Sequence, residues 1–105
     1  MDLGLKDKVA LVSGASRGIG LRIARALADE GAKLCLSGRT AETLEAAQAE
    51  LAAAGTEVEI YVGDMTDTEA ANACVAAAVR RFGSLDIVVN NVGGSVWTPF
   101  AEVTD

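Results

Sequence analysis

Three glycines stand close together near the start of the chain, in the stretch SGASRGIG at residues 13–20. Gly14 supplies a residue without a Cβ where the backbone must turn sharply after a strand. Gly18 allows a ligand to approach the backbone closely, and Gly20 allows a helix to lie against a sheet. A helix that begins here presents free N–H groups and a partial positive charge to an anion. Glycines also form plain tight turns, but this spacing predicts a pyrophosphate-binding loop.

Two arginines extend this prediction to a particular dinucleotide. Domains that prefer NAD usually place a carboxylate after the second strand, where it binds the ribose 2′-OH. This sequence has Gly38 followed by Arg39 at that point, and Arg17 lies in the glycine loop. Two guanidinium groups that converge on the adenosine ribose suit a 2′-phosphate, and so favour NADP(H) over NAD. The alternative is that both arginines are solvated surface side chains.

The elements that must position these residues follow from the hydrophobic pattern. Short aliphatic runs are typical of strands buried on both faces of a parallel sheet. Apolar residues three or four apart predict helices between them. The expected strands are residues 8–13, 33–37, 58–62 and 85–89, and the expected helices are residues 19–30, 41–54 and 67–82. The order βαβαβαβ predicts a parallel sheet with right-handed crossovers.

Residues with special backbone roles mark the ends of these helices. Each expected helix stops at a glycine that can adopt a left-handed cap, and these are Gly31, Gly55 and Gly83. Thr66, followed three residues later by Glu69, predicts a capping box for the third helix. The single proline, Pro99, is expected to lie in a loop-like tail.

Length and composition limit the classes of function. The chain has 105 residues, of which half are hydrophobic, and a net charge of −6, which fits one globular domain and argues against nucleic-acid binding. No apolar run approaches the ~20 residues that span a bilayer, and the N-terminus lacks the apolar core of a signal peptide, so we expect a cytoplasmic protein. Cys35 and Cys74 lack metal-ligand spacing, no metal site is predicted, and both are expected to be small core residues.

The glycine loop and two later motifs resemble the short-chain dehydrogenase/reductase family. SGASRGIG is similar to the family signature T-G-x-x-x-G-x-G, with Ser13 in place of threonine. GD at Gly63–Asp64 resembles the family's acidic residue beside the adenine ring. NNVG at Asn90–Gly93 resembles the N-N-A-G motif that stabilises the sheet and lines the cofactor site. TPFAEVTD resembles the entry to the next long helix of the family.

The resemblance implies a Rossmann-type α/β fold in which residues 1–105 are the dinucleotide-binding part. The strand order would be 3-2-1-4, an incomplete doubly wound sheet. The residues that would bind NADP(H) are Gly14, Ser16, Arg17, Gly18, Ile19, Gly20, Arg39, Asp64, Met65, Asn91 and Gly93. The alternative for Asp64 is that it only caps a turn. The intact protein would be a homo-oligomer that interconverts a ketone and a secondary alcohol.

The family's catalytic groups have no counterpart in this sequence. In the family, a tyrosine donates a proton, a lysine four residues later lowers its pKa, and a serine holds the substrate oxygen. The only tyrosine, Tyr61, is followed by Met65 at that spacing, so no catalytic residue is named. We also expect the 85–89 strand to have an uncovered outer edge.

Two hypotheses about the whole chain therefore remain. The first is the truncated, cofactor-binding portion of an NADP(H)-dependent enzyme. The second is a stand-alone nucleotide-binding module that self-associates through the uncovered edge or needs a partner.

Overall fold

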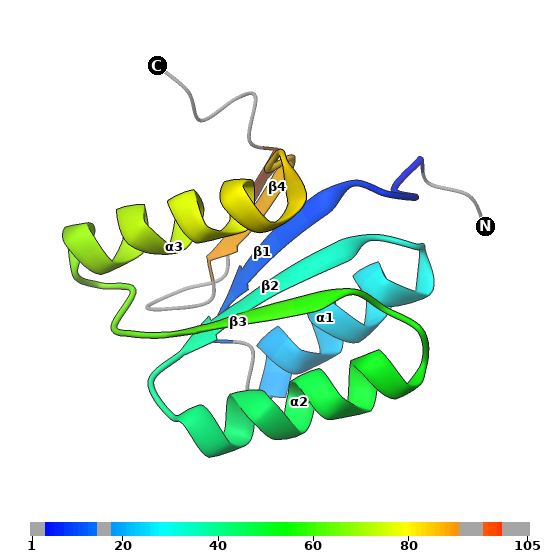
Figure 1. Ribbon diagram of the computed structural model, residues 1–105, viewed down its shortest axis with the longest axis horizontal. Helices are drawn as coiled ribbons and strands as arrows, with labels where there is room; N and C mark the ends of the chain where they lie inside the picture. Colours follow the sequence, from blue (N-terminus) through cyan, green and yellow to red (C-terminus); the bar gives the residue numbers. More distant parts are fainter. Residues whose placement is uncertain (1–3, 15–17, 91–95, 100–105) are drawn as a thin grey trace.

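The computed structural model describes residues 4–14, 18–90 and 96–99, and it has three layers. A five-stranded sheet lies between α1 and α2 on one face and α3 on the other (Figure 1). The strands are β1 (Val9–Ser13), β2 (Lys33–Gly38), β3 (Val58–Val62), β4 (Ile87–Asn90) and β5 (Val96–Pro99), and the helices are α1 (Gly18–Asp29), α2 (Ala41–Ala53) and α3 (Thr68–Phe82). The four expected strands and three expected helices are confirmed, with ends that shift by two residues at most.

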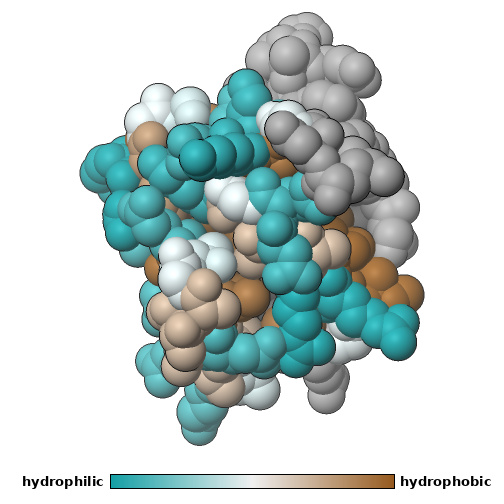
Figure 2. Space-filling model, turned by 90° about the vertical axis from the view of Figure 1, so that its right-hand side faces the viewer, coloured by the Kyte–Doolittle hydropathy of each residue, from teal (hydrophilic) through white to brown (hydrophobic). Residues whose placement is uncertain are grey.

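The strand order is β3-β2-β1-β4-β5, and its first four strands are parallel in the expected order. β1 therefore lies between β2 and β4. Asp86 aligns β4 with β1, because its Oδ2 accepts a hydrogen bond from the Val9 N–H at 2.9 Å. The Asp86 N–H also donates to the Val9 carbonyl oxygen at 2.8 Å. The strands begin on the right in Figure 1, and Figure 2 shows hydrophilic residues on this side of the molecule, with hydrophobic ones between them.

The fifth strand corrects the expectation of an uncovered edge beside β4. β5 runs antiparallel to β4, with Val96 opposite Asn90 and Pro99 opposite Ile87. The run Val-Trp-Thr consists of residue types that favour strands, and proline is tolerated in an edge strand. The nearby glycines and Pro99 predict a loop-like tail, and this prediction is wrong for residues 96–99. The edge on which the self-association hypothesis depends is therefore occupied.

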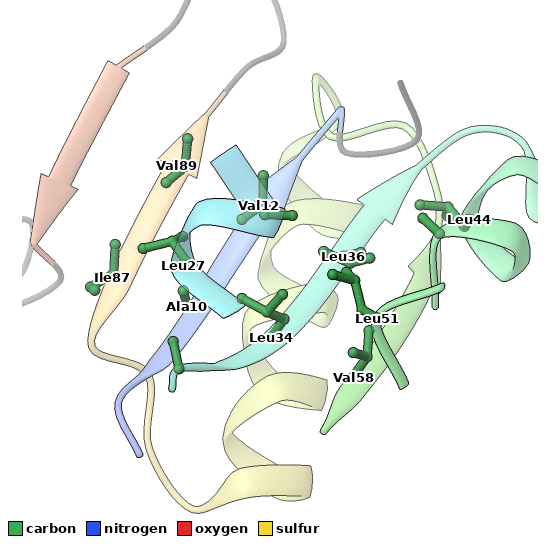
Figure 3. Packing of buried hydrophobic residues seen from close by; sticks show 13 residues of the cluster. Ala10, Val12, Leu27, Leu34, Leu36, Leu44, Leu51, Val58, Ile87 and Val89 are labelled. Carbon is green, nitrogen blue, oxygen red and sulfur yellow. The ribbon is translucent and has the colours of Figure 1, made fainter. Parts of the chain in front are cut away.

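Buried side chains form one cluster on each face of the sheet. The larger cluster joins the sheet to α1 and α2, and Figure 3 shows Leu34 and Leu36 of β2 among its members. The smaller cluster joins the sheet to α3 and contains Cys35 and Cys74, which are both fully buried. The prediction that the two cysteines are core residues is confirmed.

Small residues allow the helices to approach the sheet closely. Gly20 and Ala24 are buried in α1, and Cys74 and Ala78 are buried in α3. Gly20 thus lies where a helix packs against the sheet, as expected. Among the described residues, no helix is both long enough and apolar enough to cross a membrane.

The helix ends confirm one sequence prediction and correct another. Gly31, Gly55 and Gly83 have φ values of 89°, 94° and 89°, in the left-handed region expected of caps. The predicted capping box at Thr66 is wrong, because the N-cap of α3 is Asp67. Its Oδ1 accepts a hydrogen bond from the Glu69 N–H at 3.2 Å. Thr66 lies one residue before that cap, and its hydroxyl and N–H donate to Asp64 instead.

Candidate functional site

The first three strands end together at one edge of the sheet, on the left in Figure 1. Gly38, the last residue of β2, is paired with Val62, the last residue of β3. Two backbone hydrogen bonds continue this alignment beyond the strands. The Gly14 N–H donates to the Ser37 carbonyl at 2.9 Å, and the Gly63 N–H donates to the Gly38 carbonyl at 2.8 Å. The loops after all three strands therefore start side by side, at the edge where open α/β sheets bind ligands.

The glycine loop begins and ends with residues in the left-handed region. The φ values are 65° for Gly14 and 64° for Gly18, which residues with a Cβ rarely adopt. A Cβ built on Gly18 meets no atom within 4 Å, so its backbone faces open space. α1 begins at Gly18 and has no acidic residue in its first turn, so no carboxylate there opposes the positive end of the helix dipole. This arrangement can hold an anion such as a pyrophosphate.

Arg39 and Asp64 meet across the ends of β2 and β3. The Arg39 Nη2 lies 3.6 Å from the Asp64 Oδ1, and the two side chains are 72% and 49% exposed. The sequence suggests a different neighbour for Arg39, namely Arg17, which lies outside the described residues. The contact between Arg39 and Asp64 was not predicted from the sequence. Each residue is the first charged one after its strand, and the parallel pairing of those strands is the signal that could have found it.

Asp64 also closes the turn that leads into α3. Its Oδ1 accepts hydrogen bonds from the Thr66 hydroxyl at 2.6 Å and from the Thr66 N–H at 2.9 Å. These two bonds, and then the charge of Arg39, lower the pKa of Asp64 below its usual range. The carboxylate is thus held ionised and in one place. This is the turn-capping role that the sequence leaves open for Asp64, and it is compatible with a ligand contact.

Glycine at position 63 fits between two side chains of this edge. A Cβ built there lies 3.1 Å from Cε1 of Tyr61 and 3.3 Å from Cε of Met65, closer than ordinary contacts. Tyr61 and Met65 are both half-buried against the α3 cluster, whereas Ile19 is 57% exposed in the first turn of α1. The remaining predicted site residues lie outside the described ranges, and these are Ser16, Arg17, Asn91 and Gly93.

Comparison with known proteins identifies the family of the chain. The family model for short chain dehydrogenase matches residues 8–105 of the chain. Gluconate 5-dehydrogenase from Gluconobacter oxydans is 46% identical over 93 residues, which are 89% of this chain and 36% of that protein.

Solved structures give the same result. L-sorbose reductase from Gluconobacter frateurii, complexed with NADPH and L-sorbose, superposes with a TM-score of 0.85 at 37% identity, over 100% of this chain and 40% of that one. An alcohol dehydrogenase from Thermococcus sibiricus, complexed with 5-hydroxy-NADP, superposes with a TM-score of 0.76 at 41% identity, over 80% of this chain and 36% of that one. The chain thus spans between 36% and 40% of these proteins. The matched residues include all three strand ends of the candidate site, and the chain belongs to the short chain dehydrogenase family.

Proposed function

We propose that the chain binds NADP(H) at the carboxyl ends of β1, β2 and β3, as the cofactor-binding part of an oxidoreductase. The whole protein would interconvert a ketone and a secondary alcohol. The observation that carries the proposal is the exposed guanidinium of Arg39, after Gly38, where domains that prefer NAD have a carboxylate. NADPH or an NADP analogue is bound in two structures similar to this chain, which supports the same cofactor here.

The described residues fit the pyrophosphate and the adenosine half of such a cofactor. The first turn of α1 would bind the pyrophosphate through its N–H groups, since Gly18 leaves that backbone open. Arg39 would bind the 2′-phosphate with charge-assisted hydrogen bonds, and Asp64 would lie beside the adenine. The other proposed cofactor residues are Gly14, Ser16, Arg17, Ile19, Gly20, Met65, Asn91 and Gly93.

The bound cofactor would supply the hydride, and the residues of this chain would hold and orient it. Tyr61 is assigned no role in proton transfer. It is half-buried against the α3 cluster, and Met65 stands where the family's tyrosine has a lysine. We expect the whole protein to act on a small-molecule substrate as a cytoplasmic homo-oligomer, which cell fractionation and analytical ultracentrifugation would test.

Calorimetric titration of the chain with NADPH and with NADH tests the proposed function. We expect NADPH to bind about 10- to 100-fold more tightly, the contribution of one charge-assisted hydrogen bond. Arg39→Gln removes the guanidinium without adding a negative charge, and should bring the two affinities close together. Equal affinities for the unmodified chain would contradict the preference for NADP(H). An absence of binding to both dinucleotides would contradict the proposed site.

A further inference from the structure

One oxygen atom of Asp64 has three donors around it. The Thr66 hydroxyl and N–H bind Oδ1 at 2.6 Å and 2.9 Å, while the Arg39 guanidinium stays at 3.6 Å from the same atom. The two bonds to Thr66 are therefore short and the contact with Arg39 is loose. The side chain of Arg39 remains 72% exposed, at the edge of the sheet where the first three strands end.

The hydroxyl of Thr66 is available for this role because another residue caps α3. Asp67 accepts the hydrogen bond from the first turn of that helix, which leaves Thr66 outside the cap. The Thr66 hydroxyl donates instead to the carboxylate that precedes it by two residues. The contact of Thr66 therefore holds both the turn before α3 and the carboxylate that lies beside Arg39.

We propose that Thr66 is a positioning residue, which fixes the Asp64 carboxylate so that Arg39 stays free to bind the 2′-phosphate of the cofactor. This inference rests on the proposed function. A carboxylate and a guanidinium that meet without restraint frequently form two parallel hydrogen bonds. Such a pair would turn the guanidinium toward Asp64 and neutralise the charge that a 2′-phosphate requires. By occupying Oδ1, Thr66 prevents that pair from forming.

The test compares two ligands that differ only in the 2′-phosphate, namely 2′,5′-ADP and 5′-AMP, by calorimetry on the chain. Thr66→Val keeps the shape of the side chain and removes the hydroxyl. We expect it to weaken 2′,5′-ADP binding about fivefold and to change 5′-AMP binding less than about twofold. Thr66→Ser keeps the hydroxyl and should restore 2′,5′-ADP binding. Thr68→Val is the matched control, since Thr68 begins α3 and makes no hydrogen bond to Asp64.

A double-mutant cycle shows whether Thr66 acts through Asp64. Asp64→Asn removes the negative charge that competes for Arg39, so Thr66→Val should have no further effect on 2′,5′-ADP binding in that background. An equal effect in both backgrounds would overturn the inference.

The other outcomes separate the inference from the proposed function. If Thr66→Val weakens both ligands equally, or if serine fails to restore binding, Thr66 has only a structural role and the inference is wrong. If Thr66→Val changes neither affinity while the unmodified chain prefers 2′,5′-ADP, the inference fails and the proposed function stands. If the unmodified chain does not prefer 2′,5′-ADP, the proposed recognition of the 2′-phosphate fails and the inference fails with it.

Discussion

Arg25 of α1 and Glu50 of α2 join the two helices through a two-point ion pair, with Nε–Oε2 and Nη2–Oε1 distances of 2.6 Å and 2.9 Å. The hydrogen bonds from Arg25, more than its charge, lower the pKa of Glu50. A carboxyl whose pKa is lower in the folded protein adds stability above its unfolded pKa, and this stability is lost as the pH falls through the folded value.

Glu50→Gln should therefore lower the free energy of unfolding at neutral pH, and by a small amount because both side chains are about half exposed. Urea denaturation at a series of pH values should show the difference between variant and unmodified chain shrink toward zero in acid. High salt should shrink it as well. Glu45→Gln is the matched control, since Glu45 is an exposed carboxylate of α2 without an ion pair among the described residues. Identical curves for the two variants would contradict the prediction.

Gly18→Ala and Gly55→Ala should separate backbone strain from ligand approach. Both glycines have positive φ, at 64° and 94°, and a Cβ on either meets no atom within 4 Å. Each substitution should cost roughly 1–2 kcal/mol of stability, the penalty for an L side chain in this region. Gly18→Ala alone should also weaken NADPH binding by about tenfold or more, since its methyl would lie where the pyrophosphate approaches the backbone. Calorimetry and thermal unfolding measure both effects, and equal binding losses for the two variants would disprove the assignment of the loop.

Arg39→Asp should move the preference between the two dinucleotides toward NADH. The new carboxylate repels a 2′-phosphate and accepts hydrogen bonds from the ribose hydroxyls of NADH. We expect NADPH affinity to fall by about 10- to 100-fold and NADH affinity to hold or rise, as measured by titration. Arg80→Asp makes the same change in charge in the last turn of α3 and should alter neither affinity. Unchanged relative affinities in Arg39→Asp would mean that Arg39 is only a solvated side chain.

Cys35 and Cys74 should be unreactive in the folded protein. Both are fully buried, and the hydrogen bond between the two thiols, followed by burial, raises the pKa of Cys35. The same hydrogen bond lowers the pKa of Cys74, so the protection of both thiols rests on their burial, which keeps a disulfide reagent from reaching either sulfur. Labelling with such a reagent should be negligible in native buffer and complete in denaturant. Cys74→Ala should cost about 1 kcal/mol of stability through the small cavity it leaves. Rapid native labelling of either thiol would contradict this account.

Much of the fold could be predicted because its signals are local. Aliphatic runs identify the strands, and a glycine in the left-handed region marks the end of each helix. β5 was missed because neighbouring glycines and Pro99 indicate a loop as strongly as Val96–Thr98 indicates a strand. Thr66 was assigned to the wrong partner because Asp67 beside it is an equally good cap, and the sequence pattern does not rank the two.

Part of the candidate site was also predictable from local sequence signals. The glycine loop and Arg39 have sequence signatures, but the contact between Arg39 and Asp64 depends on the alignment of β2 with β3, 25 residues further along. The spacing of apolar residues also does not predict how deeply each helix position is buried. Val79 is 40% exposed although its spacing places it on the apolar side of α3, because Cys74 and Ala78 are the residues that meet the sheet.

The central position of β1 has a consequence for the order in which the chain acquires structure. β1 precedes the other described strands in the chain, and β2 can pair with one of its edges after a short crossover. Its other edge must wait for β4, whose alignment depends on a hydrogen bond between residues 77 positions apart. During translation, β1 therefore keeps one open edge until β4 has been synthesised, although in the structure it lies between β2 and β4. Contacts this distant in sequence form slowly, so the open edge of β1 is exposed to aggregation in the interval before β4 emerges.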